Sequence, residues 1–329
     1  MTPRGLILRN LTDGRLRLLA GALGLVALAL VMRPFPLTRH GVAILAIVDI
    51  TGSMNVRDYV GADGMPASRL DTAKAALRDL VAGLPCGSRV ALGLFTERRP
   101  FLLFTPIETC AGFAPIDGAL AALDWRMAWE GDSRISAGLF RSLAMAEELG
   151  TDLVFITDGQ EAPPLPSRGG PSFEGRPGAV RGLIVGAGAP GLSPIPRYDD
   201  RGRETGFYAA GDVQQENRFG PPPADAEHRE GYNPRNAPFG AAAARGTEHL
   251  SSVREAYLRT LAGETGLTYA PLEGSARLGA ALEGAATPRP VPGRFDPRPI
   301  LGASALLLLL ATFLAPLLRA RGIPTWKKA

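Results

Sequence analysis

The sequence predicts a doubly wound α/β domain with a central, mostly parallel sheet, flanked by N- and C-terminal transmembrane helices. Two observations predict the domain. Apolar runs of strand length end in an aspartate or run into a glycine, and amphipathic helical segments separate these runs. A third observation predicts the flanking helices: two charge-free apolar runs each lie next to a cluster of basic residues.

The charge of the chain lies mainly at its ends. The 329 residues include 36 Lys and Arg against 32 Asp and Glu, a formal charge of +4. Eight of the basic side chains lie in residues 1–17 and 319–329, and residues 18–318 carry 28 basic and 31 acidic side chains. Because nucleic-acid binding needs a basic surface on the folded domain, we expect no nucleic-acid partner.

The two apolar runs divide the chain into membrane and non-membrane parts. The run at 300–318 is long enough for a spanning helix, whereas the run at 18–32 is short and also fits the apolar part of a cleaved signal peptide. A buried core helix is the remaining alternative for both. The expected parts are a cytoplasmic N-terminus (1–17), a transmembrane helix or signal anchor (18–33), a transmembrane helix (300–318) and a cytoplasmic tail (319–329).

The Lys and Arg bias on the two sides of each run predicts an orientation. Four basic residues precede the first run and four follow the second, against two and three on the inner sides. Positive residues favour the cytoplasmic side, so residues 34–299 are expected on the far side of the membrane. In a bacterium this means an inner-membrane protein whose domain faces the periplasm.

Apolar runs and amphipathic segments alternate between 41 and 285, which we take as one domain. Strands are expected at 41–48, 89–96, 101–106, 152–157, 180–185 and 267–270, and helices at 67–84, 116–123, 133–149, 248–262 and 274–282. Ser68 is the expected N-cap of the first of these helices. The Gly- and Pro-rich stretch 189–247 is expected to be an irregular surface insertion, and 286–299 a Pro-rich tether.

The two cysteines are placed symmetrically about the expected hairpin turn. Cys86 and Cys110 each lie twelve residues from Arg98, the middle of the turn. Such positions face each other at the open end of a hairpin, so a disulfide is expected, as is usual outside the cytosol. The alternative is a pair of small buried thiols.

Hydroxyl and carboxylate side chains gather where strands end and helices begin. Asp49, Thr51 and Ser53 follow the first strand, Ser133 begins a helix and Asp158 follows a later strand. The carboxyl ends of strands in such sheets form binding sites, and hard oxygen donors suit Mg²⁺ and Ca²⁺. We therefore expect a divalent-cation site. Asp132 is a register alternative to Ser133, and simple capping of the turn by Asp49 and Ser53 is the structural alternative.

These residues resemble the metal-ion-dependent adhesion site of von Willebrand factor A domains, whose pattern is Asp-x-Ser-x-Ser, a Thr, and an Asp in a Thr-Asp-Gly turn. The resemblance implies that Thr51, Ser53 and Ser133 ligate the metal directly, and that Asp49 and Asp158 act directly or through water. It implies Mg²⁺, or Ca²⁺ or Mn²⁺, as the ion. It also implies a protein partner that supplies a carboxylate to the metal, and binding rather than catalysis.

Longer phrases resemble the MxaL-type proteins of bacterial methanol-oxidation clusters. These phrases are VDITGSMNVRD, FTERRPFLLF, LDWRMAWEGDSRI, FITDGQEAPPLP and YNPRNAPFG. The resemblance implies a role in the assembly and metal insertion of a periplasmic PQQ-dependent methanol or alcohol dehydrogenase. A MoxR-type AAA ATPase and other membrane von Willebrand factor A proteins would be partners. Bat-type aerotolerance proteins share the architecture and are the alternative.

A catalytic alternative comes from the same loop. The segment VDITGS also resembles the Asp-Lys-Thr-Gly-Thr loop of haloacid-dehalogenase-like phosphatases, in which the equivalent of Asp49 is a nucleophile. That chemistry needs a downstream lysine, and the sequence has none between Lys74 and Lys327. We therefore expect a binding protein and not an enzyme.

Overall fold

The computed structural model describes residues 14–128, 132–166, 169–213, 215, 222, 224–235, 237–240 and 246–320, the last six as backbone only. The chain forms two compact units. One is His40–Val291, and the other joins Met1–Arg39 to Pro292–Ala329. We describe each unit by itself.

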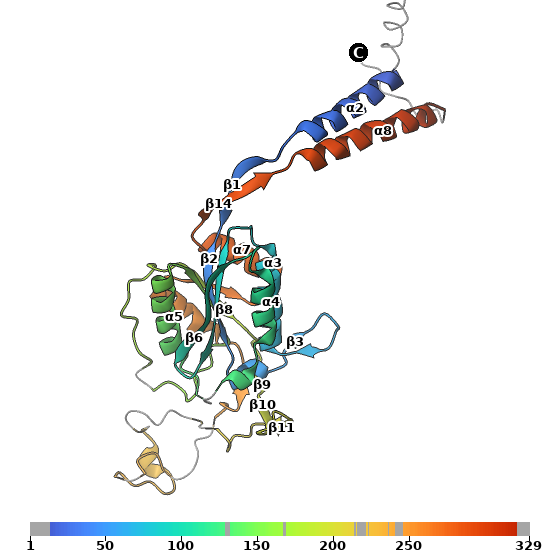
Figure 1. Cartoon of the computed structure of the whole chain (residues 1–329). Helices are drawn as coiled ribbons and strands as arrows, with labels where there is room; N and C mark the ends of the chain where they lie inside the picture. Colours follow the sequence, from blue (N-terminus) through green and yellow to red (C-terminus); the bar gives the residue numbers. More distant parts are fainter. Residues whose placement is uncertain are drawn as a thin grey trace, which may run out of the picture. The chain divides into compact units, whose positions relative to one another are not determined.

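The larger unit is built on a six-stranded sheet with the order β13-β8-β7-β2-β5-β6 (Figure 1). Five neighbouring strands run parallel, and only the edge strand β6 runs antiparallel, to β5. The strands are β2 (Ala43–Asp49), β5 (Arg89–Thr96), β6 (Arg99–Glu108), β7 (Asp152–Thr157), β8 (Gly182–Gly186) and β13 (Thr268–Pro271). The doubly wound, mostly parallel sheet is therefore confirmed.

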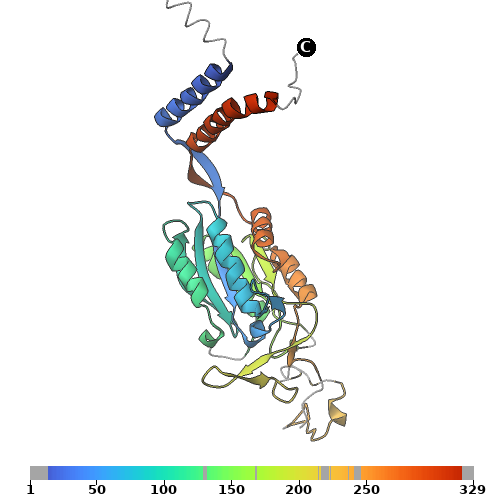
Figure 2. The ribbon, with the colours of Figure 1, turned by 90° about the vertical axis from the view of Figure 1, so that its right-hand side faces the viewer.

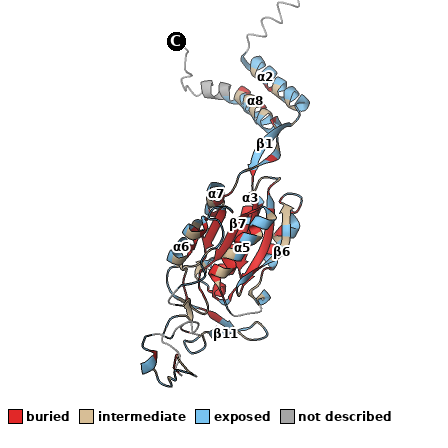
Figure 3. Cartoon of the chain, turned by 90° about the vertical axis from the view of Figure 1, so that its left-hand side faces the viewer, coloured by how far each residue is buried: buried red, intermediate tan, exposed pale blue. Residues whose placement is uncertain are grey.

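Helices cover both faces of the sheet, as Figures 1 and 2 show. The helices are α3 (Arg69–Gly83), α4 (Phe113–Ala122), α5 (Ile135–Leu149), α6 (Glu255–Thr265) and α7 (Ser275–Ala285). Helices α3, α4 and α7 pack into one apolar core, and α5 and α6 pack into the other. Every residue of β2 and β7 is buried, as the colouring of Figure 3 shows for the sheet, because both strands lie between the two cores.

The hairpin and its disulfide are confirmed. Strands β5 and β6 pair from Arg89↔Glu108 to Thr96↔Arg99, with two irregularities in register between them. Cys86 and Cys110 form a disulfide with a Cα–Cα distance of 5.2 Å. It closes the hairpin at the end away from the turn.

The beginning of α6 corrects the sequence prediction. The amphipathic pattern predicted a helix from 248, but α6 begins at Glu255. The preceding residues Leu250–Ser251 form β12, which pairs with β9 (Ser193–Pro194). The side-chain amide of Gln160 donates to the carbonyls of Glu248 and Leu250, and the Leu250 amide donates to the Thr247 carbonyl (2.8 Å). This segment therefore forms a turn and then β12 before the helix starts.

The insertion 189–247 is irregular but not without structure. It contains a two-stranded ribbon of β10 (Pro196–Tyr198) and β11 (Glu204–Phe207) and the 3-10 helix η3 (Ala226–His228). The remaining short elements of this unit are η1 (Gly52–Asn55), β3 (Tyr59–Val60), β4 (Pro66–Ala67) and η2 (Trp125–Met127).

The smaller unit contains two apolar helices and a ribbon. Helices α2 (Gly14–Val31) and α8 (Arg298–Ala320) contact each other, and β1 (Phe35–Gly41) pairs with β14 (Arg289–Phe295). The segment 286–299, predicted as a Pro-rich tether, contains β14 and the first residues of α8. Of the described helices, only α2 is long and apolar enough to cross a membrane, judged by length and composition. The apolar part of α8 over 298–314 is shorter.

Candidate functional site

The carboxyl ends of two central strands bring the predicted site residues together. Strands β2 and β7 pair up to Val48↔Ile156, so Asp49 and Thr157 leave the sheet side by side. Ser133 reaches the same place through two 2.7 Å backbone hydrogen bonds with Ala162. As a result Thr51, Ser53 and Ser133 line one cavity of about 330 Å³.

Asp49 organises the loop that carries the first hydroxyls. Its Oδ1 accepts hydrogen bonds from the Thr51 amide (2.9 Å) and the Thr51 hydroxyl (2.7 Å), and its Oδ2 accepts one from the Thr157 hydroxyl (2.6 Å). The Thr51 hydroxyl donates a hydrogen bond to Asp49, so the lone pairs of its oxygen remain available for a cation. Oδ2 also keeps a lone pair, which suits contact through a water molecule.

The carboxyl group of Asp49 is fully buried. Burial, and then the neighbouring charge of Asp158, raise the pKa of Asp49 to about 7, although the hydrogen bonds from Thr157 and Thr51 lower it. The carboxylate form of Asp49 is therefore unfavourable here, because the described residues that bond to it are neutral donors; a bound cation would favour that form.

Ser133 supplies the observation that fits a bound cation. Its side chain is 3% exposed, and its Oγ has no hydrogen-bond partner among the described residues. A buried hydroxyl without a partner costs about 1–3 kcal/mol. Asp132, the register alternative, is half exposed and lies 3.8 Å from Arg134, so Ser133 is the better candidate ligand.

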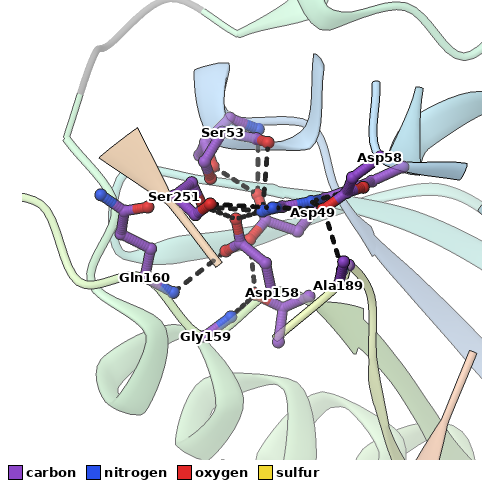
Figure 4. Close-up of polar contacts among 12 residues, drawn as sticks. Asp49, Ser53, Asp58, Asp158, Gly159, Gln160, Ala189 and Ser251 are labelled. Carbon is purple, nitrogen blue, oxygen red and sulfur yellow. Dashed lines mark hydrogen bonds and ion pairs between the residues drawn. The ribbon is translucent and has the colours of Figure 1, made fainter. Parts of the chain in front are cut away.

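A buried arginine, Arg69, which the sequence reasoning missed, bonds to three residues near the loop, Asp58, Asp158 and Ser251, which Figure 4 labels. The Arg69 guanidinium donates to Asp158 (2.7 Å), to Asp58 (2.7 Å) and to the Ser251 hydroxyl (2.7 Å). Burial alone would lower the pKa of Arg69, but the hydrogen bond to Asp58 and the charge of Asp158 raise it. Arg69 is the first residue of α3, where the helix dipole disfavours a cation, and this was the available signal.

Asp158 is committed to this network. Its Oδ2 accepts from Arg69 and from the Ser251 hydroxyl (2.9 Å), and its Oδ1 accepts from the Gln160 amide (3.0 Å). Only Oδ1 keeps room for a further contact, such as a water molecule on a metal. Two roles were predicted for Asp158, direct ligation of the metal or contact through water. The geometry favours contact through water.

The site is rich in hydroxyls and poor in the commoner metal ligands. No cluster of three or more His, Cys, Asp or Glu side chains suited to a metal occurs in the part of the chain that the structure describes. The residues that could hold an ion are Thr51, Ser53 and Ser133, supported by Asp49. Neutral oxygen donors of this kind suit Mg²⁺, Mn²⁺ or Ca²⁺.

The insertion and the segment after it supply the opposite wall of the cavity. Ile195, Tyr208, Val213 and Glu248 line it together with Gln160 and the segment 162–164. Burial raises the pKa of Glu248, whereas the charge of Arg254 lowers it. The amphipathic pattern predicts a helix at Glu248 and so does not predict its place in this cavity.

Residues 44–160 match the sequence profile of the von Willebrand factor type A domain. The match covers the loop after β2, Ser133 and the turn after β7, and the sheet and helices agree with it. The chain therefore contains a von Willebrand factor A-like α/β fold. No curated protein matched the chain by sequence.

Solved structures that the chain matches include an aerotolerance-related membrane protein from Bacteroides fragilis (17% identity, 74% of this chain and 98% of that one, TM-score 0.44). Another is a von Willebrand factor type A protein from Catenulispora acidiphila (15% identity, 82% of this chain and 44% of that one, TM-score 0.39). A third is a membrane-spanning protein from Vibrio fischeri (15% identity, 69% of this chain and 89% of that one, TM-score 0.27). These identities are too low to transfer a function.

Proposed function

We propose that this chain is a membrane-anchored binding protein whose von Willebrand factor A-like domain holds a divalent cation and, through it, a carboxylate of a partner protein. The observation that carries the proposal is the Ser133 Oγ, which is buried without a hydrogen-bond partner in the described part of the chain, in the same cavity as the hydroxyls of Thr51 and Ser53. A cation at this place would satisfy that oxygen.

The chemistry of the ligand set explains why an anionic partner would follow. Three neutral hydroxyls leave the double charge of the ion almost uncompensated, and Asp49 contributes at most one negative charge. Asp158 adds little, because Arg69 already pairs with it. An incompletely neutralised cation in a cavity attracts a carboxylate from outside.

The membrane anchor and its orientation belong to the same proposal. Helix α2 has the length and composition of a spanning helix, and we propose that α8 spans as well. The domain would then lie in the periplasm. The Cys86–Cys110 disulfide supports this placement, because disulfides persist in that compartment and are rare in the cytosol.

The metal is tested by calorimetry on the full chain in detergent micelles, with Mg²⁺, Mn²⁺ and Ca²⁺ in turn. We expect binding of at least one ion, and a loss of at least tenfold in affinity in Ser133→Ala. The matched control is Ser142→Ala. Its hydroxyl lies on α5, the helix that begins two residues after Ser133, and donates to the carbonyl of Gly138 (2.8 Å). A chain that binds none of the three ions would overturn the metal proposal.

The partner is sought by capture with wild type and with Ser133→Ala, followed by identification of what the variant loses. We propose a role in maturing a PQQ-dependent alcohol dehydrogenase with a MoxR-type ATPase, supported only by the phrases that resemble MxaL-type proteins. A Bat-type stress scaffold is the alternative, and the captured protein distinguishes the two.

Binding rather than catalysis is proposed for Asp49. Both of its carboxylate oxygens already accept hydrogen bonds from Thr51 and Thr157, and the ammonium of Lys74 donates to the Leu123 carbonyl (2.7 Å). Incubation with p-nitrophenyl phosphate and Mg²⁺ tests the phosphatase alternative. Turnover that disappears in Asp49→Asn would replace the binding proposal.

A further inference from the structure

The cavity over the cation site contains a carboxylate from the chain itself. Glu248 lines the cavity that Thr51, Ser53 and Ser133 also line. Its side chain is half-buried, and its carboxylate makes no hydrogen bond or ion pair with any described residue. The charge of Arg254 reaches it, but no ion pair forms between the two within the described structure.

The backbone at Glu248 is held in place by the site. The Gln160 side-chain amide donates to the Glu248 carbonyl (3.1 Å) and the Leu250 carbonyl (3.3 Å). The Glu248 amide donates to Oε1 of Gln215 (3.1 Å). Three residues further on, Ser251 bonds to both Arg69 and Asp158. A side chain on such a fixed backbone loses little freedom when it binds an ion.

The other carboxylates of the site have partners that Glu248 lacks. Asp158 pairs with Arg69, and Asp49 accepts three hydrogen bonds. Asp132 also lines the cavity, but it is half exposed and faces Arg134 at 3.8 Å. Among the residues that the structure describes, Glu248 is thus the carboxylate that is both unpaired and inside the cavity.

We propose that Glu248 is an internal ligand of the cation, occupying the position that a partner's carboxylate takes, so that a partner must displace it. The inference rests on the proposed function of the site. The free energy needed for displacement lowers the apparent affinity for any external carboxylate, because only the fraction of molecules with Glu248 released can bind one. The segment after the insertion, which carries Glu248, would then determine how strongly a partner's carboxylate must bind to displace it.

The experiment compares Glu248→Gln with Asp132→Asn in the full chain in detergent micelles. Both variants remove one negative charge from the same cavity, but only the first removes the internal ligand. Mg²⁺ affinity is measured by calorimetry, and acetate, the carboxylate probe, is titrated into the Mg²⁺-loaded protein. We expect Glu248→Gln to bind Mg²⁺ about tenfold more weakly and acetate more tightly than wild type. Asp132→Asn should change both affinities only slightly.

The failures of the two proposals can be told apart. A wild type that binds no ion, or a Ser133→Ala that binds as well as wild type, removes the metal site and the internal ligand with it. If Ser133→Ala loses the ion while Glu248→Gln behaves like Asp132→Asn, only the internal ligand is wrong. Weaker Mg²⁺ binding without tighter acetate binding would also overturn the displacement proposal.

Discussion

The Arg69 guanidinium donates a 2.7 Å hydrogen bond to Asp158, and neither side chain is exposed to solvent. The same guanidinium holds Asp58, whose carboxylate accepts from the Ala189 amide (2.8 Å). It also bonds to Ser251. Ala189 begins the insertion and Ser251 follows its end. The buried guanidinium of Arg69 therefore joins both ends of the insertion to the turn that follows β7. The insertion is therefore attached to the candidate cation site at two fixed points.

The hydrogen bonds around Arg69 predict the effect of removing its guanidinium. Arg69→Met would leave two buried carboxylates without their positive partner, and breaking a buried ion pair in this way costs about 3–5 kcal/mol. We expect the free energy of unfolding of the full chain, measured by urea titration with near-UV circular dichroism, to fall by that amount.

The control for Arg69→Met lies on the same helix. Arg78 pairs with Asp117 at the surface, where water screens the charges, so Arg78→Met should leave the unfolding midpoint almost unchanged. Equal destabilisation by the two variants would mean that the Arg69 network contributes no more than a surface pair.

The sheet could be predicted from the sequence because its signals are local. Strands β2 and β7 are buried on both faces, so each is a continuous apolar run, and the polar residues Asp49 and Asp158 follow where the runs stop. The hydroxyls of the site followed from the same rule about strand ends. The Cys86–Cys110 pairing followed from the symmetry of the hairpin.

The parts that were missed depend on contacts between distant segments. Nothing near Arg69 in the sequence shows that Asp158 and Ser251 surround it, since these lie 89 and 182 residues away. Likewise the helical pattern from 248 is real, but the contact of Gln160 with the Glu248 carbonyl decides the local backbone. Tertiary hydrogen bonds of this kind override local propensity.

A second prediction concerns the packing of α5 on the sheet. A Cβ atom added at Gly138 would overlap the ring of Phe95, which is fully buried and packs against Phe155 with 5.6 Å between ring centroids. Because the ring is fully buried and must shift to make room, Gly138→Ala should destabilise the domain by about 1–3 kcal/mol through overpacking. Urea unfolding of the full chain measures the change.

The matched substitution is Gly118→Ala in α4. A Cβ at Gly118 meets no atom within 4 Å, and the residue is an exposed helical position. Because alanine is the better helix former there, we expect a gain of about 0.5–1 kcal/mol. If Gly138→Ala were neutral or stabilising, as expected for Gly118→Ala, the tight contact of Gly138 with Phe95 would be wrong.

A third prediction concerns the disulfide. Cys86 and Cys110 are separated by 24 residues, and a closed loop of this size restricts the unfolded chain enough to give about 3 kcal/mol of stability. The double variant Cys86→Ala/Cys110→Ala should lose that amount in urea unfolding. Dithiothreitol should destabilise wild type and leave the double variant unchanged.

Cation binding should survive the loss of the disulfide. The cysteines lie next to Arg89, where β5 begins, whereas Asp49 pairs with Phe95 near the end of β5. Calorimetry of the double variant, under conditions where it is folded, should therefore give the affinity of wild type. A lost cation site would show that the hairpin's open end and the site are coupled through the strand.

A fourth prediction concerns acid stability near the same disulfide. The Glu108 carboxylate accepts hydrogen bonds from the amides of Ala111 and Gly87, both at 2.6 Å, and these bonds lower the pKa of Glu108 below its ordinary value. A carboxyl with a lowered folded-state pKa stabilises the protein above its unfolded pKa of about 4.3. That stabilisation is lost as the pH falls through the folded pKa.

Glu108→Gln should therefore be less stable than wild type at neutral pH, because its neutral amide cannot replace the charge-assisted bonds to Gly87 and Ala111. Below the folded-state pKa, where the wild-type carboxyl is protonated, the two proteins should have similar stability. Urea unfolding at a series of pH values follows the difference between them. A difference that stays constant from neutral to acid pH would show that the charge of Glu108 contributes nothing, and that the substitution acts only through the shape of the loop.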